Sequence, residues 1–88
     1  MRVKVRLSSH VRSYTGGQAE VAAEGSTLFE VMADLERHYP GIRFRVIDEQ
    51  DRIRPHMNFF VGEALTRDLG HPIRPGEEVH ILGALSGG

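Results

Sequence analysis

Hydrophobic and polar residues alternate at the start of the chain. In the stretch 2–7 every second residue is apolar and the others are cationic. Successive side chains of a strand point to opposite faces of its sheet, so this pattern predicts a half-buried strand. A weaker alternation over 19–23 follows a turn-rich stretch that contains Gly16 and Gly17. The two segments together predict an antiparallel hairpin.

The stretch 25–41 carries the pattern of a helix. Its apolar residues recur three or four positions apart: Leu28, Val31, Met32, Leu35 and Tyr39. Thr27 and Glu30 have the spacing of a capping box, in which side chains satisfy backbone N–H groups of the first turn. Pro40 and Gly41 end the helix. One amphipathic helix is therefore expected, with a single apolar stripe to bury.

Three more strands are expected after the helix. Residues 42–47 alternate around Phe44 and predict a short strand. Residues 57–63 predict a strand with hydrophobic side chains on both faces, and residues 78–84 predict the last strand. The segment 67–78 contains two prolines and two glycines and is expected to be a loop.

This order of elements predicts one α+β domain, in which one main helix packs on one face of a mixed sheet of four to five strands. A hairpin followed by a helical crossover lets the first and last strands lie parallel in the middle of the sheet. That is the ubiquitin-like β-grasp arrangement. We expect the domain to span residues 1–82 and a flexible tail to span residues 83–88.

Composition narrows the classes of function. The chain has 88 residues and a net charge of −1, so no basic field favours nucleic acid. The absence of cysteine excludes a disulfide framework, a thiolate metal site and a cysteine nucleophile. No apolar run resembles a signal peptide or a membrane span. A cytoplasmic protein with neither nucleic-acid nor membrane partners is expected.

No group of residues resembles an active site. The five histidines lie in five different segments, without the short spacing of metal ligands. The acidic cluster within 48–51 lacks the central glycine and the closing glutamate of a calcium loop. We therefore expect no metal site, and any chemistry must use a group that every protein has.

The sequence ends in ALSGG, residues 84–88, after the last expected strand. A carboxylate at a chain end becomes a good electrophile once ATP converts it to an acyl-adenylate. Glycine has no Cβ, so two terminal glycines make a thin substrate for the narrow passage of an adenylating enzyme. A frayed terminus without a function is the alternative.

Four segments, taken in order, resemble the ThiS/MoaD family of ubiquitin-like sulfur carriers: VRLSSHVRSYTG, GSTLFEVMADLERHYPG, MNFFVGE and RPGEEVHIL, with the terminal glycines after them. The resemblance implies that a ubiquitin-activating-type enzyme adenylates Gly88 with ATP and magnesium. A sulfur donor then converts the adenylate to a thiocarboxylate, and the sulfur passes to a biosynthetic enzyme. Gly87 would keep the passage clear and Leu85 would seat the tail. The chain itself would bind no cofactor.

The expected strand faces also indicate a docking surface. Phe60 and Leu82 fall on the sheet face opposite the helix-covered residues. An apolar patch in that position is typical of a partner site. Arg54 and Arg74 are expected to flank the patch and to pair with acidic groups of the partner.

Several alternatives stay open. The segment RIRPHMNFFVGE resembles the carriers of cysteine biosynthesis and also the small subunits of molybdopterin synthase, in which the chain would be part of an enzyme. A ubiquitin-like modifier that forms isopeptide bonds is another possibility, and a non-reactive β-grasp docking module is a third. On the docking face, the long loop could instead cover the patch through Leu65 or Leu69. Except in the synthase, the chain is expected to be a protein co-substrate and not an enzyme.

Overall fold

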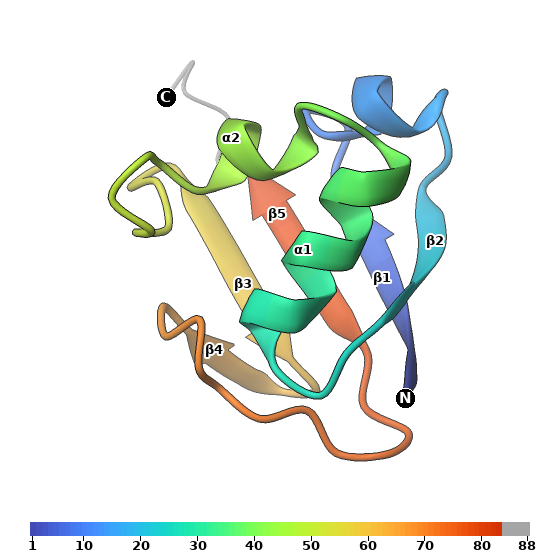
Figure 1. The fold of residues 1–88 in the computed structure, drawn as a ribbon, viewed down its shortest axis with the longest axis vertical. Helices are drawn as coiled ribbons and strands as arrows, with labels where there is room; N and C mark the ends of the chain where they lie inside the picture. Colours follow the sequence, from blue (N-terminus) through green and yellow to red (C-terminus); the bar gives the residue numbers. More distant parts are fainter. Residues whose placement is uncertain (84–88) are drawn as a thin grey trace.

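The computed structural model describes residues 1–83, which form a five-stranded sheet with the main helix across one face (Figure 1). The strand order is β2-β1-β5-β3-β4. Along the chain the elements are β1 (Arg2–Leu7), the 3-10 helix η1 (Arg12–Thr15), β2 (Glu20–Glu24), α1 (Leu28–His38), α2 (Ile42–Val46), β3 (Met57–Val61), β4 (Ala64–Thr66) and β5 (Val79–Gly83).

The first and last strands lie side by side and parallel in the middle of the sheet. Val5 of β1 pairs with Val79 of β5, and Leu7 pairs with Ile81. Strands β2 and β3 flank this pair and run antiparallel to their neighbours. Parallel neighbours need a long crossover, which the segment containing α1 supplies. The predicted mixed sheet and β-grasp topology are confirmed.

The core lies between α1 and one face of the sheet. Alternate residues of the three central strands are buried there: Val3, Val5, Leu7, Met57, Phe59, Val61, Val79 and Ile81. The helix adds Leu28, Val31, Met32 and Leu35 from its apolar stripe. The helical and alternating spacings in the sequence predict these two layers correctly, because each period places its apolar residues on one side.

Hydrogen bonds fix the first turn of α1 and hold the helix against strand β2. The Oγ1 atom of Thr27 accepts a hydrogen bond from the Glu30 N–H at 3.2 Å, and the Glu30 carboxylate accepts one from the Ser26 N–H at 2.8 Å. One turn later, the buried Asp34 carboxylate accepts the backbone N–H of Glu24 at 2.9 Å. That bond lowers the pKa of Asp34 below its ordinary value and ties the helix to β2.

The strand predicted over residues 42–47 is wrong, since Ile42–Val46 form the short helix α2. Ile42 and Val46, four residues apart, are both buried, whereas Phe44 between them is 58% exposed. The alternation of apolar residues with arginines is equally compatible with one turn of helix, and the tertiary contacts select the helix. Gly41, with φ of +99°, makes the sharp turn between α1 and α2.

Strand β4 is not predicted by the sequence, because three residues are too few to show a period. It follows a tight turn at Gly62, where φ is +59°, and pairs with β3 from Phe59↔Thr66 to Val61↔Ala64. This pairing places Leu65 directly opposite Phe60. The strand therefore widens the open face of the sheet, which α1 does not cover.

Candidate functional site

The open face of the sheet carries an apolar cluster on β3, β4 and β5. Phe60 lies opposite Leu65 on one side, and Leu82 lies diagonally from it on the other side, because Leu82 pairs with Asn58. Leu65 is 60% exposed and Leu82 is 39% exposed, while Phe60, on the strand between them, is half-buried. We call these three residues the apolar half of the open face.

The alternative in which the loop covers this patch is wrong. Leu65 belongs to β4 and is itself an exposed member of the apolar half. Leu69 packs against the hydrophobic core instead of lying over Phe60. Phe60 and Leu82 therefore share one accessible surface, as the alternation in the sequence predicts.

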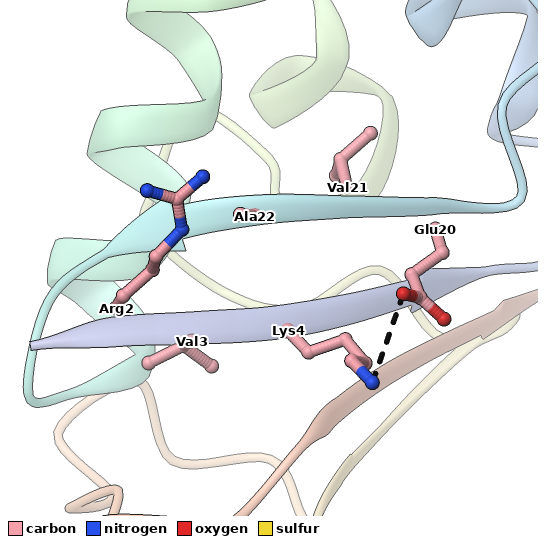
Figure 2. A pocket seen from close by; sticks show the side chains of 6 residues that line it. All are labelled: Arg2, Val3, Lys4, Glu20, Val21 and Ala22. Carbon is pink, nitrogen blue, oxygen red and sulfur yellow. Dashed lines mark ion pairs between the residues drawn. The ribbon is translucent and has the colours of Figure 1, made fainter.

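The rest of the open face is occupied by ion pairs, which we call the ion-pair half. Lys4 lies 3.8 Å from carboxylate oxygens of both Glu20 and Glu78, a network of which Figure 2 shows the Glu20 pair. Arg6 reaches the same two carboxylates at 3.4 and 3.2 Å. The hydrogen bond from Arg6, with further attraction from Lys4, holds the pKa of Glu78 below its ordinary value of 4.5.

The end of β5 is held by residues that follow β1. The backbone N–H of Gly83 donates a hydrogen bond to Ser8 Oγ at 2.9 Å, and the Ser8 N–H donates to the Ile81 carbonyl at 3.0 Å. The ring of His10 packs against Gly83, so that a methyl group on Gly83 would lie 3.4 Å from it. These contacts fix the point from which the chain continues into residues 84–88.

The sequence analysis did not identify Ser8 or His10 as part of this site. Their role depends on the parallel pairing of β1 with β5, which brings the residue after one strand beside the end of the other. The only signal in the sequence is the topology itself. Once two parallel central strands are predicted, the residues that follow both strands are expected to meet.

The two predicted arginines lie at opposite ends of β3 and β5. Arg54 precedes β3, and its Nε donates to the Phe44 carbonyl at 2.8 Å, near the end of β5 because Met57 pairs with Gly83. Arg74 lies in the loop before β5 and shares a surface hollow with Val61. The two arginines thus lie at opposite ends of the two strands that carry Phe60 and Leu82, and their pairing with acidic groups of a partner stays a prediction.

The remaining predicted site residues, Leu85, Gly87 and Gly88, lie outside the described residues. Within residues 1–83, no three His, Cys, Asp or Glu side chains come together as a set of metal ligands. Among the same residues, every helix is too short or too polar to cross a membrane.

Comparison with known proteins gives a consistent result. The model of the ThiS family matches residues 5–88. The sulfur carrier protein CysO of Mycobacterium tuberculosis is 38% identical over 93 aligned positions, which cover all of this chain and all of CysO. The CysO of Mycobacterium bovis matches equally.

Solved structures agree with these sequence matches. In the Amycolatopsis orientalis BexX/CysO complex, the matching chain superposes with a TM-score of 0.89 at 30% identity, over 98% of this chain and 99% of that one. The crystal structure of Mycobacterium tuberculosis CysO gives a TM-score of 0.87 at 35% identity, over 94% and 99% of the two chains. The small archaeal modifier protein SAMP1 of Haloferax volcanii gives 0.84 at 19% identity over the whole of both chains, a likeness of fold alone.

Proposed function

The chain belongs to the ThiS family, and we propose from this premise that it is a sulfur carrier protein that donates sulfur in cofactor or cysteine biosynthesis. One observation carries the proposal: the match to CysO at 38% identity extends over the whole of both chains. In this role the chain is a protein co-substrate and not an enzyme.

We place the chemistry at the carboxyl group of Gly88. An adenylating enzyme of the ubiquitin-activating type joins this carboxylate to the α-phosphate of ATP and releases pyrophosphate, with magnesium balancing the phosphate charge. A donor that supplies sulfur at the oxidation level of sulfide then attacks the acyl carbon, and AMP leaves. The product is a thiocarboxylate, from which a biosynthetic enzyme takes the sulfur. Gly87 leaves room beside the reacting carbonyl, since it has no Cβ.

The described residues contribute position and docking. Ser8 and His10 hold Gly83, so the residues after it start from a fixed point. The apolar half supplies an exposed hydrophobic surface for the partner on the same domain. A related chain forms a complex with BexX in Amycolatopsis orientalis, which supports a role that depends on a partner protein.

Intact mass spectrometry tests the proposal. We expect incubation with ATP, magnesium, a sulfide source and the adenylating enzyme from the same genome to raise the protein's mass by the difference between sulfur and oxygen. The matched control lacks Gly88 and should show no change. A competent enzyme that leaves the wild-type mass unchanged would favour a non-reactive docking module, and conjugates to lysines would favour a modifier.

Some features of the proposal stay predictions. No observation favours the molybdopterin synthase subunit over the carrier, and the likeness to SAMP1 concerns the fold alone. The sulfur donor, the acceptor enzyme and the cytoplasmic address are expected from the sequence. Co-purification of a stable larger subunit would favour the synthase.

A further inference from the structure

A second surface feature lies at the end of the sheet where β5 finishes. Three segments that are distant in sequence line one groove there: η1, α2 and the residues that lead into β3. The groove is lined by Tyr14, Phe44, Arg45, Arg54 and His56. We call it the arginine groove.

The groove is built in a defined shape. Arg54 donates from Nε to the Phe44 carbonyl at 2.8 Å, and its guanidinium carbon lies 4.5 Å from the centre of the Phe44 ring. This arrangement fixes the guanidinium over an aromatic face while its terminal nitrogens stay available. Tyr14 packs beside Gly41, where a side chain would lie only 3.0 Å from the ring. Gly41 therefore makes room for one wall of the groove.

The charge in the groove is one-sided. The lining includes two arginines and a histidine but no carboxylate. Within residues 1–83, Arg45 makes no ion pair or side-chain hydrogen bond, in contrast to Lys4 and Arg6 on the open face. The carboxylate of Asp48 accepts backbone N–H groups of Arg52 and Gln50, which lower its pKa, and the positive charge of Arg54 adds to this lowering.

The position of the groove relates it to the proposed chemistry. Helix η1 follows β1, which runs parallel to β5, and Arg54 and His56 precede β3, whose first residue pairs with Gly83. All three lining segments thus lie toward the end of the sheet where β5 finishes, and in the view of Figure 1 α2 is drawn at the same end as the arrowhead of β5. Gly83, the last described residue before the carboxyl group proposed to react, lies at this end, so we expect the adenylating enzyme to approach it.

We propose that the arginine groove docks an acidic segment of the adenylating partner, with carboxylates of that segment paired to Arg45 and Arg54. The inference rests on the proposed function for the identity of the partner. Guanidinium groups bind carboxylates in pairs of parallel hydrogen bonds. The apolar half and the groove then form two separate contacts, one hydrophobic and one electrostatic.

Sulfur loading of matched double variants tests the proposal. We expect Arg45→Gln with Arg54→Gln to raise the KM of the adenylating enzyme for the carrier about tenfold, to leave kcat within about twofold, and to flatten the salt dependence of KM. The control, Arg2→Gln with Arg37→Gln, removes the same charge from exposed positions that do not line the groove. Because Arg37 pairs with the buried Asp34, the stability of this variant is measured by urea denaturation beside the loading assay. Equal losses in both variants, or an unchanged KM in the groove variant, would overturn the proposal.

A single variant shows whether the effect of the double variant comes from lost binding or from misfolding. Arg45 is exposed and has no described side-chain partner, so Arg45→Gln should keep the amide NMR spectrum of the wild type. Its KM should rise about threefold, in the same direction as for the double variant. A KM equal to the wild-type value would contradict the role of Arg45.

An NMR titration separates the groove from the proposed function. The isolated protein, labelled with ¹⁵N, is titrated with a short peptide rich in Asp and Glu and, separately, with its Asn and Gln counterpart. We expect the acidic peptide alone to shift the amide signals of residues 44–45 and 54–56, even if no sulfur loading occurs at all. Shifts with both peptides or with neither would overturn the proposal, as would saturation by inorganic phosphate without any response to the acidic peptide.

Discussion

The two halves of the open sheet face differ in whether their side chains find partners within the same domain. In the ion-pair half, Lys4 and Arg6 each lie within 4.0 Å of two carboxylates, and His80 lies 3.5 Å from one of the same carboxylates. In the apolar half, Leu65 and Leu82 stand exposed, and no other part of residues 1–83 covers them. The charged groups of the ion-pair half are paired with one another, whereas the hydrophobic side chains of the apolar half are left uncovered.

This difference indicates which half is free for a partner. A docking protein that covered the ion-pair half would have to desolvate several charges that already have partners, which costs free energy. Covering Phe60 and Leu82 removes apolar surface from water at no such cost. Polar residues at the edge of the patch, Asn58 and His80, complete the usual pattern of an apolar centre with a polar rim.

The largest effect is expected from removing a core side chain that lies under the open face and supports both of its halves. Phe59 is fully buried on the opposite face of β3 from Phe60 and pairs with Ile81. We expect Phe59→Ala to lower the free energy of unfolding by about 3–5 kcal/mol, measured by urea denaturation. Phe60→Ala, the adjacent control, should cost about 1 kcal/mol because its side chain is only half-buried. Equal losses would mean that the open face is part of the core.

Introducing one carboxylate into each half tests whether the two halves contribute differently to binding of the adenylating enzyme. We expect Leu82→Asp to weaken binding to the adenylating enzyme about 30-fold or more, since a carboxylate at the centre of an apolar contact is buried without a partner. The control, Ala22→Asp, introduces the same charge beside Lys4 in the ion-pair half and should change the affinity less than about threefold. Calorimetric titration measures both. Equal effects would show that the two halves bind alike or that neither binds.

Much of the fold could be predicted from the sequence, because the periods are long enough to decide between helix and strand. The alternation in β1 and the helical stripe of α1 both place their buried residues correctly. The errors fall where the pattern is short. Residues 42–46 alternate over less than two turns of helix, so their burial and the turn at Gly41 decide the structure.

The site could be predicted only in part, for a different physical reason. Phe60 and Leu82 share a face because each strand has a period of two, which the sequence displays directly. The contact of Ser8 with Gly83 joins residues 75 positions apart. The arginine groove likewise brings together three segments whose meeting depends on tertiary packing. No local period reports such contacts.

The smallest expected effect concerns how the stability that the ion-pair half contributes depends on pH. The pKa of Glu78 lies below its ordinary value of 4.5, chiefly because Arg6 donates a hydrogen bond to the ionised carboxylate. The folded state thus favours the charged form more than the unfolded state does. The resulting stabilisation is present above pH 4.5 and is lost as the pH falls through the folded pKa.

Glu78→Gln removes this titration from the network that Lys4, Arg6 and His80 share. We expect a small loss of stability near pH 6.5 that shrinks steadily as urea unfolding is repeated down to pH 3. The control is Glu63→Gln, since Glu63 has no ion pair within the described part of the chain. The same measurements on this control show the effect of a Glu→Gln change outside the ion-pair half. A stability difference between Glu78→Gln and the wild type that stays constant over this range would mean that the ion pairs of Glu78 add nothing electrostatic to the stability of the fold.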